Sequence, residues 1–315
     1  MTLPAKSRMA GLPALFARRP RWLQGAAAAT TRALDSTFES ERWESMRRAG
    51  RRWGWLGAGL GAVAGLVMCA PASWLANAVT SVTSQRLLLA EADGTVWQGS
   101  AVAVLSGGPG SRDARVLPGR LHWQLGWRER GVSLVLQQDC CTPEPVAIHI
   151  KPSWGRVDVT VGTRPDPRSA VQASGELGHW PAAWLGGLGT PWNTLQLSGA
   201  LRVSSNQLSV AWAKGQLQVS GQVEIWLDHV ASRVTTLNQI GSYRLLLQGR
   251  PQGPVQMSMR TLEGALQLSG EGQIGPRGVQ FRGEARASEA ERGALDNLLN
   301  IIGRREGDRS VISIG

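Results

Sequence analysis

Histidine and carboxylate side chains are the groups that could supply metal or acid–base chemistry in this 315-residue chain. The four histidines are spread along the sequence, at His122, His149, His179 and His229. No two of them have the spacing of metal ligands, and no cysteine or carboxylate joins them in a compact motif. We interpret each histidine as a solvated residue or as a core residue with a satisfied hydrogen bond.

Motifs for nucleophilic or phosphate chemistry are also missing from the sequence, which has no Gly-x-Ser-x-Gly elbow and no loop ending in Gly-Lys-Ser/Thr. Gly59-x-Gly61-x-x-Ala64 formally matches the dinucleotide-binding fingerprint. It lies in an apolar stretch and no strand precedes it, so the match carries no functional meaning. The sequence therefore predicts a protein that is not an enzyme, with no catalytic residue, no metal site and no cofactor.

The three cysteines give a weaker signal. Cys69 lies in the apolar stretch, whereas Cys140 and Cys141 are neighbours. Neighbouring cysteines can bridge only through a strained ring. We therefore expect Cys140 and Cys141 to be two small, semi-buried residues, and a vicinal or intermolecular disulfide is the alternative.

A charge-free stretch from Trp53 to Gln85 is the most informative element of the chain. Its apolar part approaches the roughly 20 residues that cross a bilayer. Basic residues stay on the cytoplasmic side of such a span, and four arginines stand immediately before it: Arg47, Arg48, Arg51 and Arg52. We predict a cytoplasmic basic arm at residues 1–52 and a transmembrane anchor at residues 53–78. The bulk of a single-pass inner-membrane protein then lies in the periplasm.

Two other interpretations of this stretch are a cleaved signal peptide and a lipoprotein signal. The first is disfavoured because 52 residues precede the stretch, more than a signal peptide carries. The second is disfavoured because Val67 and Met68, rather than small residues, precede Cys69. The arm carries most of the net charge of +11. The basic excess is therefore explained by membrane orientation, and we predict no nucleic-acid partner.

Gly57, Gly61 and Gly65 are spaced four residues apart in the apolar stretch, which places them on one helix face. Small residues on one face let a second membrane helix approach closely. The sequence therefore indicates a partner helix, although a general Gly/Ala richness of the stretch would explain the pattern equally well.

After Arg86 the apolar residues alternate with polar ones in many short runs, such as Leu121-x-Trp123-x-Leu125. Alternation at this period predicts half-buried strands in antiparallel meanders. We expect a first periplasmic β half at residues 86–161, a Pro- and Trp-rich connection at 162–194 and a second β half at 195–315. The halves could form one sheet or two domains.

One helix is also readable, at residues 288–303. Ser288 and Glu291 form a capping box, and Leu295, Leu298 and Leu299 share a face. The predicted fold is therefore mainly β: a single N-terminal transmembrane helix, then a curled antiparallel β-sheet domain with this C-terminal helix packed on it. Four Gly residues that follow an apolar-polar pair inside strand runs predict the bends that curl the sheet: Gly199, Gly221, Gly270 and Gly283.

A more specific motif follows the anchor, Gly94-Thr95-x-Trp97-x-Gly99, with Trp123 in the next run. Together with Gly241-Ser-Tyr-Arg-Leu245 and Leu298-Leu-Asn-Ile-Ile-Gly303, it resembles the type II secretion system protein N family over roughly residues 75–315. The resemblance implies a non-enzymatic inner-membrane accessory subunit that supports export of folded proteins across the outer membrane. It also implies other type II secretion inner-membrane subunits as partners. The arm before residue 53 is longer than the family pattern.

Two other functions would each require a specific feature of the chain. A periplasmic lipid-binding or lipid-transfer module would use an apolar concave sheet face, and lipid would then be a partner in addition to the bilayer. A hydrolase would need a clustered site that the sequence lacks. The fourteen tryptophans fill a core in one interpretation and form an exposed aromatic row for a partner or lipid in the other. A groove left open along the apolar face would favour the lipid module, and a face filled by the helix at 288–303 would disfavour it.

Overall fold

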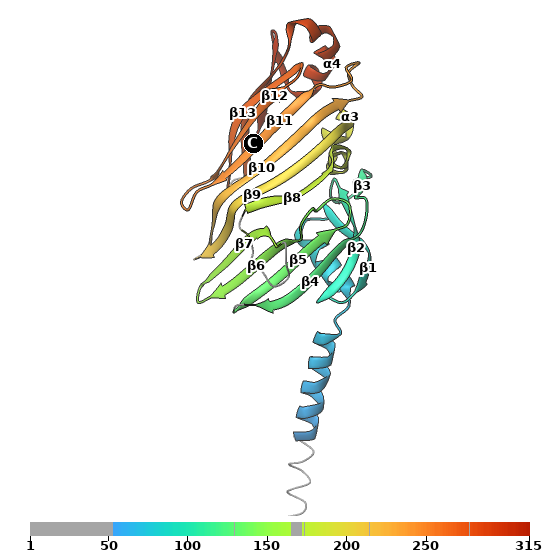
Figure 1. Ribbon diagram of the computed structural model, residues 1–315, viewed down its shortest axis with the longest axis vertical. Coiled ribbons are helices and arrows are strands. Elements are labelled where there is room, and N and C mark those ends of the chain that lie inside the picture. The colour runs from blue at the N-terminus through green and yellow to red at the C-terminus, as the bar shows by residue number, and fades with distance from the viewer. Residues whose placement is uncertain (1–52, 129, 165–171, 173, 214, 277) are drawn as a thin grey trace, which may run out of the picture. The chain divides into compact units, whose positions relative to one another are not determined.

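The computed structural model describes residues 53–128, 130–164, 172, 174–213, 215–276 and 278–315 (Figure 1). The predicted arm at residues 1–52 lies outside the described residues. By contacts the chain divides into two units, Met1–Val67 and Met68–Gly315. In the first unit the described residues are helical, and this helix extends over residues 53–68.

No helix within the described ranges has the length and apolar character that a bilayer crossing requires. The charge-free stretch is divided near Pro71. The residue before a proline is disfavoured in the α region, and Ala70 is accordingly non-helical. A second helix, α2 (Ala72–Val82), follows Pro71 and buries Ala72 and Ala76. Residues 72–78, which the sequence grouped with the anchor, therefore belong to a helix that packs in the second unit.

The second unit consists mainly of one antiparallel sheet that is not closed. Its first part is built from seven strands in the described residues: β1 (Leu87–Gly94), β2 (Gln98–Ser106), β3 (Ala114–Val116), β4 (Leu121–Arg128), β5 (Gly131–Gln138), β6 (Val146–Ser153) and β7 (Arg156–Thr163). Strands β4 to β7 lie on alternating runs such as Leu121-x-Trp123-x-Leu125, as predicted, and a two-residue turn joins β6 to β7.

The described part of the segment at 162–194 contains regular secondary structure. It contains the strand β8 (Ser174–Pro181), which pairs with β9, and then a 3₁₀ helix η1 (Ala182–Leu188) and a short helix α3 (Trp192–Leu195). The expectation of an extended connection missed β8 because its sequence, Ser-Gly-Glu-Leu-Gly-His-Trp-Pro, has little apolar alternation. The helix η1 begins directly after Pro181.

The later strands are longer. Among the described residues they are β9 (Leu197–Ala213), β10 (Gln216–Ser232), β11 (Gly241–Gly249), β12 (Val255–Glu263), β13 (Leu266–Gly275), β14 (Gly278–Ala287), β15 (Arg304–Glu306) and β16 (Arg309–Ile314). Strand β9 pairs with β7 through residues 209–213 and with β8 through residues 200–206. The two β halves that the sequence left open as one sheet or two domains therefore share one sheet.

Neighbours in the sheet are mostly neighbours in sequence. The path runs β1-β2-β4-β5-β6-β7-β9-β10-β11-β12-β13-β14-β16-β15 in the described part of the chain, with β3 beside β2 and β8 beside β9 (Figure 1). The register places apolar residues of successive strands on one face, as in the row Ile225, Leu245 and Met259, and polar residues on the other, as in the row Arg244, Arg260 and Ser269. We call these the apolar face and the polar face.

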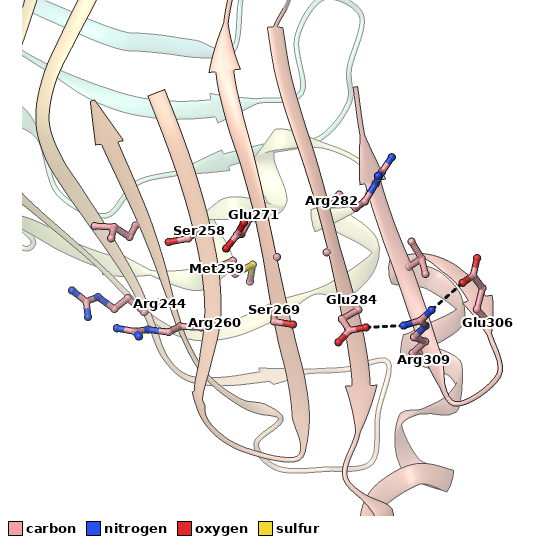
Figure 2. Close-up of a pocket in the computed structure, with 14 residues that line it drawn as sticks. Arg244, Ser258, Met259, Arg260, Ser269, Glu271, Arg282, Glu284, Glu306 and Arg309 are labelled. Carbon is pink, nitrogen blue, oxygen red and sulfur yellow. Dashed lines mark hydrogen bonds and ion pairs between the residues drawn. The ribbon is translucent and has the colours of Figure 1, made fainter. Parts of the chain in front are cut away.

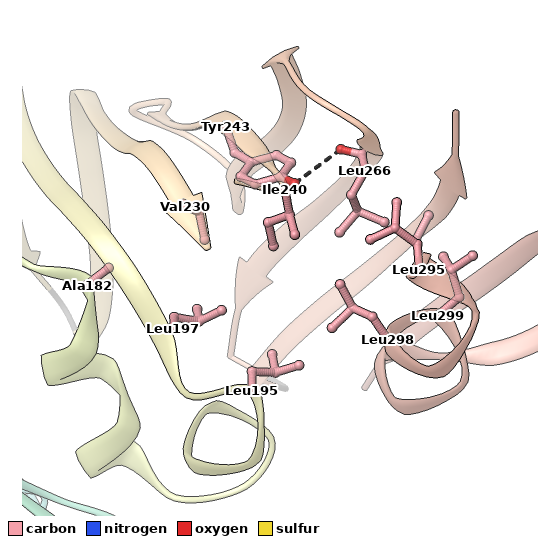
Figure 3. Close-up of a cluster of buried hydrophobic side chains, with 11 residues drawn as sticks. Ala182, Leu195, Leu197, Val230, Ile240, Tyr243, Leu266, Leu295, Leu298 and Leu299 are labelled. Carbon is pink, nitrogen blue, oxygen red and sulfur yellow. Dashed lines mark hydrogen bonds between the residues drawn. The ribbon is translucent and has the colours of Figure 1, made fainter. Parts of the chain in front are cut away.

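The C-terminal helix packs on the apolar face, as predicted. A 3₁₀ turn η2 (Glu289–Glu291) precedes α4 (Arg292–Ile302), so the α-helix itself begins later than the predicted residue 288. The capping box is not made, because the Ser288 side chain forms no capping hydrogen bond. Leu295, Leu298 and Leu299 are fully buried against residues of the sheet, among them Leu266 and Ala285 (Figure 3).

The glycines predicted to bend the sheet divide into two kinds. Gly199 and Gly221 lie at register shifts, and both have a positive φ, as glycine at a bulge does. Gly270 and Gly283 instead face each other in regular register. A Cβ atom at Gly270 would lie 2.4 Å from Cζ of Phe281. These two glycines therefore make room for an aromatic ring, a contact that strand pairing creates and the local sequence does not reveal.

Tyr243, the sole tyrosine of the chain, lies in the core beside α4 and donates a hydrogen bond from its hydroxyl to the carbonyl oxygen of Leu266, 3.1 Å away (Figure 3). Burial disfavours the phenolate and raises the pKa of Tyr243 well above its ordinary value. We therefore expect native protein to show no phenolate absorbance at pH 11, whereas unfolded protein titrates near pH 10.

Because the folded pKa is the higher one, this contribution to stability is complete below about pH 10 and is lost as the pH rises above it. Absorbance titration of native and denatured protein measures Tyr243 without interference from another tyrosine. Titration of the native protein near pH 10 would contradict the burial.

Candidate functional site

The Gly-Thr-x-Trp-x-Gly motif forms the turn between β1 and β2. Gly94 and Gly99 pair across the end of the two strands, and Thr95 donates its backbone N–H to the carbonyl oxygen of Gln98 at 2.8 Å. Gly94 has φ +92°, and a Cβ atom there would lie 2.6 Å from the same carbonyl oxygen. Residue 94 must therefore be glycine for the turn to close.

Trp123 lies beneath this turn, on β4, and only 2% of it is exposed. Its indole Nε1–H donates to the carbonyl oxygens of Thr95 and Val96, both at 3.2 Å. Gly99 provides the space for the ring, since a Cβ atom there would lie 2.5 Å from Cζ2 of Trp123. The motif residues and Trp123 thus form one packed unit rather than the wall of a cavity.

The same turn fastens the start of the second unit to the sheet. Val96 donates its backbone N–H to the carbonyl oxygen of Ala70 at 2.9 Å, and Pro71 forms a β-bridge with Thr95. Ala72 of α2 is buried with Trp123 and Ala101 in a small core. In the structure these residues lock the segment at residues 70–76 onto β1, β2 and β4.

A polar hollow of about 920 Å³ lies on the polar face of β11 to β16. Figure 2 shows the side chains that project from these strands around it. Arg309 holds Glu284 at 3.2 Å and Glu306 at 3.7 Å. The charged residues of the lining are Arg244, Arg260, Glu271, Arg282, Glu284, Glu306 and Arg309. A hollow with both signs of charge suits a polar partner surface better than an apolar ligand.

The hollow cannot be recognised from the sequence. Its charged residues lie on separate strands, and only the register brings them together, for example by placing Glu271 opposite Arg282 and Arg244 opposite Arg260. Their signal in the sequence was the polar half of each alternating run. That signal gives the face of the sheet and leaves the neighbours on that face undetermined.

Local pairing keeps the polar face charged. A hydrogen bond to Asp228 raises the pKa of Arg202, and a hydrogen bond from Arg304 lowers the pKa of Glu306. The guanidinium carbons of Arg202 on β9 and Arg244 on β11 lie 5.1 and 5.3 Å from the ring centroid of Trp226, which is on β10 between these two strands. Both distances are within the range of a cation–π contact.

The histidines lie on four different strands, β4, β6, β8 and β10. His122 lies 3.6 Å from Asp139, His179 lies 3.6 Å from Glu176, and His149 is buried. Across the described ranges, no three His, Cys, Asp or Glu side chains gather closely enough to hold a metal ion. We find no group of described residues that would activate a nucleophile.

Cys140 and Cys141 form a vicinal disulfide, so the expectation of two independent small residues was wrong and the alternative holds. The two lie in the turn after β5, and turn geometry brings the two sulfurs together in a way that residue spacing alone could not establish. Cys69 is free.

The glycine face predicted in the anchor lies in the helix over residues 53–68. Cβ atoms built at Gly57, Gly61 and Gly65 meet nothing within 4 Å. Larger side chains at these positions would therefore not disturb the packing of the described chain, and this makes the face suitable for mutational tests.

Comparison with known proteins places this architecture in a family. A family model described as type II secretion system (T2SS), protein N, matches residues 85–312, which include the whole sheet from β1 to most of β16. No curated protein and no solved structure matches the chain. The matched region contains the Gly-Thr-x-Trp-x-Gly turn, Trp123 and α4. The chain belongs to the type II secretion system protein N family.

Proposed function

We propose that this chain is a non-enzymatic accessory subunit of the type II secretion system, anchored in the inner membrane through the part of the predicted anchor that precedes Ala70. Its sheet would then lie in the periplasm and support export of folded proteins across the outer membrane. The family match over residues 85–312 carries the proposal. A component of this system works with its other subunits, and we propose that the direct partners are inner-membrane subunits.

The surfaces of the sheet are consistent with binding to proteins. The polar hollow presents arginine and glutamate side chains from six strands, β11 to β16, and complementary charge is a common means of selecting a partner. The strands at the two ends of the path, β1 and β15, each pair on one side in the described part of the chain. An open strand edge can accept a strand from another protein.

The alternative, a periplasmic lipid-binding or lipid-transfer module, needs an open apolar groove. The structure offers less support for it. Helix α4 covers one end of the apolar face and α2 packs at the other, while the hollow lined by Arg244, Glu271 and Arg309 lies on the polar face. These observations favour the secretion subunit.

Cross-linking from membranes tests the proposal. We expect the wild-type chain to recover other inner-membrane secretion subunits, and Gly61→Leu to reduce this recovery about tenfold, because a large side chain keeps a second helix away. Gly59→Leu is the matched control: it makes the same change on the opposite face of the helix, also in open space. It should leave recovery unchanged.

Recovery of no secretion component by the wild-type chain would contradict the proposed function. Equal recovery with Gly61→Leu and Gly59→Leu would instead contradict only the glycine face as the contact.

A further inference from the structure

Several hairpin turns of the first part of the sheet lie at the same end of the sheet. Turns β4–β5, β6–β7 and β9–β10 all lie at this end, because Arg156 at the start of β7 pairs with Ala213 at the end of β9, and β4 to β7 form a continuous meander. Figure 1 shows the β4–β5 and β6–β7 hairpins ending on the same side. We call this the tip end.

The tip end exposes three tryptophans. Trp154 occupies the β6–β7 turn and is fully exposed, while Trp127 is 76% exposed and Trp212 is 56% exposed. Trp127 and Trp212 project from the apolar face, where Trp212 pairs with Val157 and Leu217, both exposed. Since β4 and β9 are four strand spacings apart, the row extends over about 20 Å.

Basic residues accompany the tryptophans. The described residues of these turns and their flanks include Arg128, Arg130, Lys151 and Arg156 against Asp158, which pairs with Arg156 at 2.8 Å. Tryptophan with arginine and lysine is the composition of segments that lie at the boundary between lipid and water, where the ring meets the acyl chains and the cation meets the phosphates.

The chain also joins the second unit at the tip end. Turn β1–β2 lies at this end, since Gln98 at the start of β2 pairs with Gln124 and Leu125 donates its N–H to the carbonyl oxygen of Trp97. Ala70 and Pro71 are bound to this same turn. The segment that precedes α2 is therefore bound at the tip end.

We propose that the tip end docks on the bilayer, with Trp127, Trp154 and Trp212 in the interfacial region and the basic residues near the lipid phosphates. This inference rests on the membrane anchor of the proposed function and adds a second membrane contact to it. A bilayer is favoured over a protein because the three exposed tryptophans are spread over about 20 Å along one end of the sheet, Trp154 in a turn and Trp127 and Trp212 near strand ends. A protein partner would have to supply a separate cavity for each ring, whereas a bilayer accepts all three at one depth.

Site-specific probes on the full chain test this docking. In a Cys69→Ser background, Trp154→Cys and Trp127→Cys are each labelled with the fluorophore NBD, since the paired Cys140 and Cys141 do not react. The protein is reconstituted in phosphatidylcholine–phosphatidylglycerol vesicles that carry a nitroxide on the acyl chain near the headgroup. Leu262→Cys is the control: Leu262 is also an exposed apolar residue, but it lies near the opposite end of β12.

We expect the nitroxide to reduce NBD emission at least about twofold at positions 154 and 127, and by less than about a tenth at position 262, because only the tips reach the interface. Lack of quenching at both tip positions, in vesicles that retain the chain after an alkaline wash, would overturn the docking and leave the anchor intact. Loss of the chain in that wash would overturn the anchor and the docking with it. If the NBD emission of the tip probes changed only when other secretion subunits were added, the change would identify a protein contact and overturn the bilayer proposal.

Discussion

Replacing Trp123 with alanine should lower the free energy of unfolding by about 3–5 kcal/mol, the usual cost of removing a large aromatic side chain from a core. The ring fills the space above Gly99, and its indole N–H satisfies two backbone carbonyls of the β1–β2 turn. Without it, the turn and α2 lose their common support. The midpoint of thermal unfolding, followed by circular dichroism in detergent, should fall by roughly 10 °C.

Trp154→Ala is the control for this prediction. It deletes the same side chain at a fully exposed turn position, so the free energy of unfolding should change by no more than about 0.5 kcal/mol. Similar losses in the two variants would show that Trp123 does not hold the turn as described.

The second large effect is expected from Leu298→Ala in α4. Leu298 is 1% exposed and packs with Leu295, Leu299 and residues of the sheet (Figure 3). Truncation of a fully buried leucine costs about 2–5 kcal/mol of unfolding free energy. The cost has two parts, the lost contacts and the cavity that the surroundings fill only in part. Chemical denaturation of the purified full chain measures this cost.

Leu262→Ala provides the matched comparison, since it makes the same substitution on an exposed side chain of β12. Its effect should stay within about 0.5 kcal/mol. If Leu298→Ala proved equally mild, α4 would not be part of the core of the second unit, and the apolar face near β14 would be open.

The sequence predicted those parts of the fold that depend on local periodicity. Alternation located strands such as β4 and β6, and the leucine spacing located α4, because both patterns record which face of an element is buried. It missed β8, where glycine and polar residues replace the alternation, and it misplaced the start of α4, because Ser288 opens a 3₁₀ turn instead of capping the helix. Element ends depend on a few hydrogen bonds that tertiary packing can redirect.

The candidate site shows the same division. The motif residues and Trp123 stand out in the sequence. The hydrogen bonds from Trp123 to Thr95 and Val96, however, join positions that are 28 and 27 residues apart. The polar hollow depends on the pairing of six strands, and the vicinal disulfide depends on one turn. Long-range register decides such contacts, and a single sequence carries no direct record of it.

The near-sequential order of strands in the sheet has a consequence for how the protein is made. Each hairpin needs only the one synthesised before it as a template, so loops closed during folding are short and entropically inexpensive. A polypeptide delivered from its N-terminus can add strands one after another while its later part is still being synthesised. β9 departs from this order, because it pairs with β7 as well as with β8, and β14 does so too, because it pairs with β16. The β9 junction has two earlier strands as partners. That junction is where we expect such stepwise growth to pause.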